Sequence, residues 1–338
     1  MLKCIAGIDE FKGSWQAGGR LAPERLKVLK RVATVESVGS STRIEGANLT
    51  NQEIENLLSG LDISPLSSRD EQEVAGYADA VNIICESYPA IPFTENHVRQ
   101  LHKILLGRSS KDIRHRGEYK KIGNSIQAVL PDGRRRTVFE TASPFDTPGE
   151  MTSLLDWTNS AFEKEELHPL LTIGIFTVCF LAIHPFQDGN GRLSRLLTTL
   201  PLLKSGYVYV PYSSLESVIE RNKEKYYLAL RKTQVTLKSE NADYGPWLEF
   251  FLFSLKTQAD MLAEKTARER KTVSLPELSD QIIRLVKAHG RLAISDMETM
   301  TGANRNTLKK RLRELVRDRY LEKHGRGRGT RYITGPGV

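Results

Sequence analysis

Apolar residues recur at helical spacing along most of the chain, and this pattern predicts a mainly α-helical protein. Over residues 21–38 they return close to the 3.6-residue period of a helix, and Pro23 fits its first turn. Thr50 and Glu53 have the spacing of a capping box, which predicts a short helix through residue 58. The same periodicity predicts further helices over residues 71–86, 94–106, 150–162, 169–183, 191–203, 214–238 and 245–266.

One central segment departs from this pattern. Over residues 118–140 the apolar residues Ile122, Val129 and Val138 are spaced among glycine and asparagine, and a Pro-Asp-Gly turn occupies residues 131–133. Such a sequence is typical of two strands joined by a tight turn. We therefore expect a small β-hairpin, or flap, within the helical core.

The composition is that of a soluble globular protein, with 39% hydrophobic and 27% charged residues in 338. The longest apolar stretch, residues 170–183, is too short for a membrane helix, and acidic residues soon after the start argue against a signal peptide. Cys4, Cys85 and Cys179 are far apart and form no CxxC pair, which excludes a disulfide scaffold and a cysteine zinc site. We expect a cytoplasmic protein that does not associate with membranes.

The positive charge is concentrated at one end of the chain. The formal net charge is +8, and over residues 276–338 basic residues exceed acidic residues by seven. Residues 263–272 are charged and have no apolar stripe, so we expect a linker over residues 263–275. This asymmetry indicates a separate C-terminal module with an anionic partner.

The segment from His184 to Arg195, HPFQDGNGRLSR, lies between two predicted helices and combines several chemical groups. Its Gly-Asn-Gly turn lets the backbone approach a ligand, and the start of the next helix favours an anion. Arg192 and Arg195 lie on one face of that helix and can clamp phosphate oxygens. Asp188 can hold Mg²⁺ on those phosphates, and His184 can accept a proton from an attacking hydroxyl.

The alternative interpretation of this segment is a plain helix-to-helix turn with an incidental histidine. A histidine, an aspartate, a glycine-rich turn and two arginines within one short segment favour a phosphate site with a base and a metal ligand. Such a site predicts transfer of a phosphate-containing group to the hydroxyl of a protein or a small molecule.

The segment resembles the motif of the Fic family, HPFx(D/E)GNGRxxR, at every specified position, and the resemblance covers roughly residues 71–253. It implies a mostly helical fold and a reaction that transfers AMP from ATP to a Ser, Thr or Tyr hydroxyl of a protein, with release of pyrophosphate. ATP and Mg²⁺ are then the expected cofactors. Transfer of UMP, of GMP or of another phosphate-containing group stays open.

The resemblance also implies roles for individual residues. His184 would be the general base, Phe186 would anchor the loop in the core, and Asp188 would bind Mg²⁺. The flap would pair with the target protein by strand addition and cover the nucleotide. The residues expected at ATP and its phosphates are Gly189, Asn190, Gly191, Arg192, Arg195, Asn222, Ile122 and Gly123.

A second motif near the N-terminus points to inhibition. Residues 41–46 are similar to the family's inhibitory motif, (S/T)xxxE(G/N), through Ser41, Glu45 and Gly46. The Glu45 carboxylate is expected to form a bidentate pair with Arg195, which takes that arginine away from the γ-phosphate. In the class with an N-terminal motif, this glutamate can also position a water that removes AMP from the target.

Residues 276–338 resemble a winged helix-turn-helix domain. Helices are expected over residues 278–289, from a capping box at Ser295 to Thr301, and over 304–319, followed by two strands around a turn rich in glycine and arginine. The third helix would enter the major groove of DNA. The residues expected to contact DNA are Arg305, Asn306, Lys309, Lys310, Arg313, Arg326 and Arg328. The alternative is a winged helix used for protein contacts or dimerisation.

The sequence thus predicts an N-terminal helical region over residues 1–70, a Fic catalytic domain over 71–262 with its motif at 184–195, the linker, and the winged helix. The leading functional prediction is an autoinhibited protein adenylyltransferase whose partner is a target protein, which can be the chain itself. A homodimer is compatible with the sequence. The rival prediction is a DNA-binding regulator that uses the Fic core as a nucleotide sensor.

Overall fold

The computed structural model describes residues 1–17, 22–60, 66, 68–129, 135–273, 276–325 and 327–335, without the side chains of residues 126–138, 270–273 and 328. The described chain forms two compact units, Met1–Met261 and Leu262–Val338. Helices dominate both units, which confirms the predicted mainly helical fold class.

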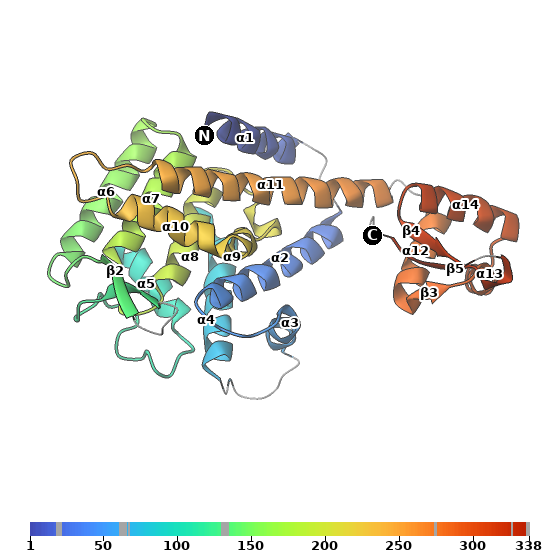
Figure 1. Cartoon of the computed structure of the whole chain (residues 1–338), viewed down its shortest axis with the longest axis horizontal. Coiled ribbons are helices and arrows are strands. Elements are labelled where there is room, and N and C mark those ends of the chain that lie inside the picture. Colours follow the sequence, from blue (N-terminus) through green and yellow to red (C-terminus); the bar gives the residue numbers. More distant parts are fainter. Residues whose placement is uncertain are drawn as a thin grey trace. The chain divides into compact units, whose positions relative to one another are not determined.

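The first unit is a helical assembly, drawn from blue to orange in Figure 1. Two 3₁₀ turns, at Tyr88–Ala90 and Val210–Tyr212, connect some of its helices. The helices are α1 (Leu2–Ala17), α2 (Pro23–Ile44), α3 (Asn51–Leu58), α4 (Arg69–Ser87), α5 (Glu95–Leu105), α6 (Thr147–Lys164), α7 (Pro169–Ile183), α8 (Asn190–Lys204), α9 (Leu215–Arg221), α10 (Lys223–Gln234) and α11 (Gly245–Val273), whose residues up to Met261 belong to this unit.

Helices α7 and α8 form the centre of this unit (Figure 1). α7 is apolar on nearly all sides and is covered by α6, α8 and α10, while α8 also contacts α2, α4 and α5. A helix that is hydrophobic all round is stable only when it is enclosed. The segment between these two helices is residues 184–189, so the predicted motif lies at the junction of the two most enclosed elements.

The predicted flap is a two-stranded antiparallel hairpin. β1 (Ser125–Val129) pairs with β2 (Arg135–Glu140), with Ser125 opposite Glu140 and an irregular register between Ile126 and Gln127. The turn expected at residues 131–133 lies outside the described residues.

Two expectations about helices were wrong, namely an unbroken helix over 214–238 and a side-chain cap at Thr94, and one helix of the N-terminal helical region was not individually predicted. The helix expected over 214–238 is broken at Asn222, whose backbone leaves helical geometry and whose amide Nδ2 donates to the Val218 carbonyl at 2.9 Å. Thr94 precedes α5 without a side-chain capping bond, because its hydroxyl contacts His97 Nδ1 instead. The N-terminal helix α1 was not predicted, since its apolar residues form only a weak stripe.

The second unit contains three helices and a small antiparallel sheet. α12 (Glu277–His289), α13 (Ile294–Thr301) and α14 (Arg305–Arg317) pack around a core that includes Ile282, Val286 and Leu312. The sheet has the order β3–β5–β4, from β3 (Arg291–Leu292), β5 (Arg331–Thr334) and β4 (Leu321–His324), and a 3₁₀ turn at Gly327–Gly329 precedes β5. This arrangement is compatible with the expected winged helix.

The start of α13 differs from the prediction in one detail. The helix begins one residue before Ser295, and the Asp296 carboxylate accepts the Ala293 N–H at 2.8 Å. An acidic side chain in the first turn satisfies a free donor there, so it replaces the capping box expected at Ser295.

None of the described helices combines the length and apolar character that a membrane span needs.

Candidate active site

The backbone around His184 is shaped for ligand contact. His184 ends α7 in the left-handed region, with φ 52°, and Gly189 begins α8 with φ 79°. A glycine is needed at the second position, because other residues rarely adopt that conformation. The turn therefore directs the first N–H groups of α8 and the His184 side chain toward the same space.

Three interactions hold the turn in this shape. The Asn190 side chain bonds both backbone groups of Phe186, accepting its N–H at 2.9 Å and donating to its carbonyl at 2.7 Å. The buried His102 ring stacks on Phe186 with centroids 3.8 Å apart. His102 Nε2 lies 3.0 Å from the Asp188 carbonyl oxygen, and Nδ1 accepts the Gly117 N–H at 2.9 Å. Phe186 thus lies in the core, and Asn190 stabilises the turn itself.

The base of the flap is fastened to the same turn through Lys120. Its ammonium is buried and donates to Asn124 Oδ1, Thr141 Oγ1 and the Ile183 carbonyl, each at 2.9 Å. Burial lowers the pKa of Lys120 to about 8. Asn124 also donates to the Phe186 carbonyl at 3.0 Å. These contacts join both ends of the hairpin to the residues around His184.

A cavity of about 480 Å³ opens over the turn. His184, Asp188 and the start of α8 form one wall, and Glu45 and Ser125 approach from α2 and the flap. The remaining wall belongs to α10. Its residues, which the sequence did not single out, are Tyr226, Tyr227, Leu230, Arg231 and Gln234.

The imidazole of His184 is oriented by a backbone group. Nδ1 lies 3.3 Å from the Leu181 carbonyl oxygen, so this nitrogen carries the proton when the ring is neutral. Burial, together with the nearby Lys120 charge, lowers the pKa of His184 to about 4. The side chain is therefore neutral near pH 7, and Nε2 is free to accept a proton.

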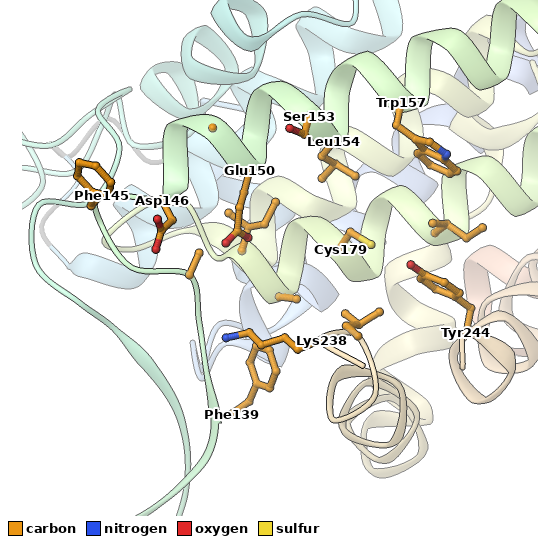
Figure 2. A pocket seen from close by; sticks show the side chains of 16 residues that line it. Phe139, Phe145, Asp146, Glu150, Ser153, Leu154, Trp157, Cys179, Lys238 and Tyr244 are labelled. Carbon is orange, nitrogen blue, oxygen red and sulfur yellow. The ribbon is translucent and has the colours of Figure 1, made fainter. Parts of the chain in front are cut away.

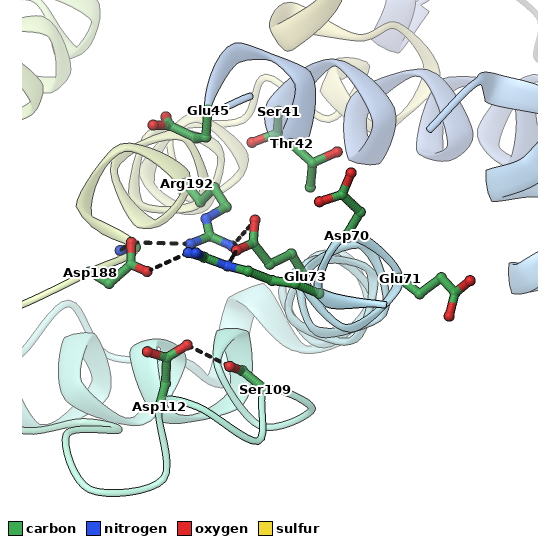
Figure 3. A network of polar contacts seen from close by, with 12 residues as sticks. Ser41, Thr42, Glu45, Asp70, Glu71, Glu73, Ser109, Asp112, Asp188 and Arg192 are labelled. Atoms are coloured by element: carbon green, nitrogen blue, oxygen red, sulfur yellow. Dashed lines mark hydrogen bonds and ion pairs between the residues drawn. The ribbon is translucent and has the colours of Figure 1, made fainter. Parts of the chain in front are cut away.

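Asp188 and Arg192 belong to a network of charges in Figure 3. Arg192 Nη1 lies 2.9 Å from Glu73 Oε2, and Arg192 Nη2 lies 3.3 Å from Asp188 Oδ1. Arg69 from the start of α4 joins both acids, with 2.7 Å to Glu73 and 3.1 Å to Asp188. Glu73 is almost completely buried, so it holds Arg192 in one orientation.

Asp188 is the metal ligand that the sequence proposes. Its Oδ1 also accepts the Gly189 N–H at 2.6 Å. The described residues include no group of three or more His, Cys, Asp or Glu side chains that could hold a metal by themselves. Mg²⁺ commonly binds to one or two carboxylates with substrate phosphates and water, so a single aspartate beside a phosphate cradle fits that mode.

Arg195 is buried and contacts the residues of the N-terminal motif. Its Nε donates to Ser41 Oγ at 2.8 Å, and its Nη2 donates to the Ser41 carbonyl at 2.9 Å and to Glu45 Oε1 at 2.8 Å. The expected Glu45 contact is therefore present, but it involves one carboxylate oxygen and one guanidinium nitrogen, Nη2, which Glu45 shares with the Ser41 carbonyl. The bidentate geometry that we expected was wrong.

The Glu45 carboxylate bonds to Arg195 and also lies close to Gly191 in the first turn of α8. A Cβ placed on Gly191 would collide with this carboxylate, so the carboxylate fills the space above the start of α8. Arg195 Nη1 is buried and makes no hydrogen bond to any described residue. A buried N–H group without a partner is costly, so Arg195 Nη1 fits a site at which an anionic group such as a phosphate binds.

Three predicted nucleotide residues lie away from this cavity. Asn222 is the break between α9 and α10, and Ile122 and Gly123 are exposed at the base of the flap. None of them is among the cavity's lining residues, whereas the neighbouring Ser125 is. Gly46, at the end of the N-terminal motif, is exposed and has φ 108°.

A second, larger cavity of about 910 Å³ lies between α6, α7 and the end of the flap, as Figure 2 shows. Phe139, Phe145, Trp157 and Tyr244 surround it, and Cys179 lies at its floor. Its residues Ala182 and Ile183 directly precede His184, so both cavities have lining residues at the end of α7.

The residues proposed for DNA lie on α14 where the structure describes them. Arg305, Asn306, Lys309, Lys310 and Arg313 are exposed, and Arg305 pairs with Glu298 at 2.9 Å. Arg326 and the side chain of Arg328 lie outside the described residues.

Comparisons with known proteins show what the chain is similar to. Residues 92–202 match the model of the Fic/DOC family, and residues 261–330 match a family of bacterial proteins of unknown function, DUF977. The protein adenylyltransferase Fic of Drosophila willistoni is 24% identical over 294 residues, which are 83% of this chain and 53% of that protein. The chain thus spans about half the length of the curated relatives it matches.

Two solved structures have the same fold. A Fic family protein from Desulfovibrio desulfuricans is 25% identical, with a TM-score of 0.63 over 99% of this chain and 95% of that chain. A signaling protein with a Fic domain from Bacteroides thetaiotaomicron is 28% identical, with a TM-score of 0.62 over 75% of this chain and 95% of that chain.

Proposed function

Because residues 92–202 match the model of the Fic/DOC family, we propose that the protein transfers AMP from ATP to a Ser, Thr or Tyr hydroxyl of a target protein and releases pyrophosphate. The observation that carries this proposal is the convergence of His184, Asp188 and the start of α8 on one cavity. The relatives named protein adenylyltransferase support the same class of reaction.

His184 is the general base of this proposal. As the hydroxyl oxygen bonds to the α-phosphorus, its proton passes to Nε2, and the bond from that phosphorus to the leaving pyrophosphate breaks. The Leu181 carbonyl fixes the Nδ1–H tautomer. The lowered pKa keeps the ring unprotonated, so the base is available across the neutral pH range.

The phosphates would bind at the first N–H groups of α8 and at Arg192 and Arg195, where the helix dipole and two guanidinium groups favour negative charge. Asp188 would hold Mg²⁺, which neutralises phosphate charge when it is bound. To do so Asp188 must exchange at least part of its pairing with Arg69 and Arg192 for the metal.

We also propose that Glu45 inhibits this activity. Its carboxylate occupies Arg195 and the space over Gly191, where it repels a phosphate and removes one of its donors. Replacement by glycine removes the charge while leaving Ser41 to hold Arg195. An extension of this proposal is that Glu45 positions a water for removal of AMP from the modified target.

The test uses ATP labelled at the α- or the γ-phosphate, with wild type, Glu45→Gly and His184→Ala, and with His289→Ala as a control on an exposed histidine of the second unit. We expect α-label on protein, more of it with Glu45→Gly, and none with His184→Ala. Protein labelled only from the γ-phosphate would assign a kinase-like transfer instead. Nucleotide binding without any label would favour the nucleotide-sensor alternative.

For the second unit we propose binding to double-stranded DNA. The supporting observation is the exposed basic surface of α14, in a unit whose basic residues exceed its acidic residues by nine. Binding to a mixed-sequence duplex that weakens steeply as salt rises would support this proposal. The alternative is a surface for protein contacts, which predicts no such DNA affinity.

A further inference from the structure

The buried ammonium of Lys120 is an unusual feature beside the candidate active site. Lys120 is 3% exposed, and among the described residues no carboxylate forms an ion pair with it. Burying a charge without an ion pair is costly, so every hydrogen must have an acceptor. All three do, at 2.9 Å each, and the acceptors come from three separate segments: Asn124, Thr141 and Ile183.

The positions of these three acceptors in the fold show which elements the Lys120 ammonium connects. Asn124 directly precedes β1, and Thr141 directly follows β2, so the ammonium joins the two ends of the flap. Ile183 is the last residue of α7, where a carbonyl has no helical partner and the helix dipole favours a cation. The residue after Ile183 is His184.

Further hydrogen bonds join the base of the flap to the turn that follows α7. The Lys120 N–H donates to the Pro185 carbonyl at 2.8 Å, and Asn124 Nδ2 donates to the Phe186 carbonyl at 3.0 Å. Thr141 Oγ1 also lies 2.8 Å from the Asn124 carbonyl oxygen. The flap base and the His184 turn are therefore one hydrogen-bonded body, in which the Lys120 ammonium is the only charged side chain among these bonds.

We propose that Lys120 is a positioning residue, which sets the flap and His184 in register so that a target segment paired with the flap presents its hydroxyl to the base. This inference rests on the proposed function, because it assumes that His184 deprotonates that hydroxyl. Lys120 is not among the residues that line the nucleotide cavity. Its contacts are with the flap base and the end of α7, so its effect should be larger on acceptor use than on nucleotide binding.

The test compares Lys120→Met with Lys121→Met, its exposed neighbour, both in the Glu45→Gly background. The acceptor is the chain's own His184→Ala variant, and nucleotide binding is measured with ATP and Mg²⁺. We expect Lys120→Met to lower kcat/KM for the acceptor by about tenfold or more, since small misplacement of reacting groups slows the reaction. The Kd for ATP should change by much less, and Lys121→Met should alter neither quantity.

A second measurement does not depend on activity. Hydrogen–deuterium exchange should increase in residues 121–129 and 135–141 of Lys120→Met while α8 and the second unit keep their protection. Thr141→Val removes one acceptor and should cause a smaller change of the same kind, and adding it to Lys120→Met should add little, because both act on one network.

The outcomes separate the two proposals. Absence of AMP transfer by the Glu45→Gly parent would defeat the proposed function, whereas the exchange data would still decide whether Lys120 fastens the flap to α7. An equal loss of ATP binding and acceptor use, or exchange that rises throughout the first unit, would show a general structural role and overturn the positioning role.

Discussion

At the scale of single residues, His102 shows how burial fixes a protonation state. Both ring nitrogens are used, with Nδ1 accepting the Gly117 N–H and Nε2 facing the Asp188 carbonyl. Burial lowers the pKa of His102 from 6.5 to about 4. A proton on Nδ1 would break the bond from Gly117, so the folded state requires the neutral ring.

This requirement predicts how stability depends on pH. Between pH 6.5 and about 4 the unfolded chain binds a proton at His102 that the folded chain does not, so stability is full above pH 6.5 and falls as the pH falls. One such histidine gives a slope of up to about 1.4 kcal/mol per pH unit. The midpoint of urea unfolding at each pH measures this dependence. Unfolding is monitored by the fluorescence of Trp15, Trp157 and Trp247, which all lie in the first unit.

The control for this prediction is His102→Gln, which keeps polar groups and cannot titrate in this range. It should lower stability at pH 7 and flatten the dependence below pH 6.5; a variant curve parallel to that of the wild type would contradict the assignment to His102. His184 has a similarly lowered pKa, so a residual slope is expected in the variant.

Ser41 provides a second prediction at this scale. Its hydroxyl holds Arg195 Nε at 2.8 Å, on the side of the guanidinium that Glu45 does not contact. Ser41→Ala leaves that buried donor unpaired, at a cost of about 1–3 kcal/mol. We expect a lower melting temperature and a rise in AMP transfer that is smaller than with Glu45→Gly, because Glu45 loses only part of the support for its partner. Transfer rates and melting curves of the two variants check this order.

The residues of the candidate site were predictable from the sequence only where they lie close together along the chain. The turn from His184 to Arg195 carries its chemistry in consecutive positions, and Ser41 with Glu45 form a short motif. Glu73, His102 and Lys120 each have a partner at the end of α7, in the turn or in α8 that lies at least 60 residues away, and they belong to no short motif. Their roles follow from packing that local patterns do not encode.

At the scale of elements, close helix packing depends on particular glycines. A Cβ on Gly76 of α4 would collide with the Leu105 carbonyl oxygen of α5, which is backbone and cannot move aside. Gly13 of α1 is exposed and has open space around its Cβ position. The same substitution therefore has opposite expected effects at the two sites.

Gly76→Ala should destabilise the first unit by about 1–3 kcal/mol, because overpacking forces α4 and α5 apart. Gly13→Ala should stabilise it by up to about 1 kcal/mol, because alanine is the better helix former and meets no neighbour. Thermal unfolding of the two variants measures both effects. Equal destabilisation by both would show that helix α1 or its surroundings differ from the structure described above.

Helix positions were predictable where an apolar stripe or a cap is strong. The helices expected at 169–183 and after Thr50 match α7 and α3, since one is apolar throughout and the other has a complete capping box. The break at Asn222 was missed because periodicity continues across it, and only the side-chain bond to Val218 interrupts the helix. For α1, contacts such as His168 with Asp9 at 2.9 Å compensate for a weak stripe.

At the scale of the whole molecule, the two units have separate cores. The second unit encloses its own apolar residues, among them Ile282, Met297, Leu308 and Tyr332. We therefore expect residues 262–338 to fold without the rest of the chain. A cooperative thermal transition of that fragment, with helical circular dichroism, would bear this out, whereas a fragment without such a transition would show that it needs the first unit.

The positive net charge of the chain lies in the unit proposed to bind DNA and not in the unit proposed to transfer AMP. All of the excess lies in the second unit, and Lys309 and Lys310 are exposed on α14. Each lysine that contacts a phosphate releases a counterion, so removing it should lower the slope of log affinity against log salt by about one. Lys309→Ala and Lys310→Ala should each show this, while Lys287→Ala, which is exposed on α12, should leave the slope unchanged.

Fluorescence anisotropy with a labelled mixed-sequence duplex, from about 50 to 200 mM salt, measures these slopes on the full chain. AMP transfer by the same variants in the Glu45→Gly background should equal that of the parent, because neither lysine belongs to the unit that contains His184. Absence of duplex binding at the lowest salt, or an equal effect of Lys287→Ala, would contradict a DNA surface on α14. The charge of α14 would then fit the protein-contact alternative, in which solvated lysines carry no information about nucleic acid.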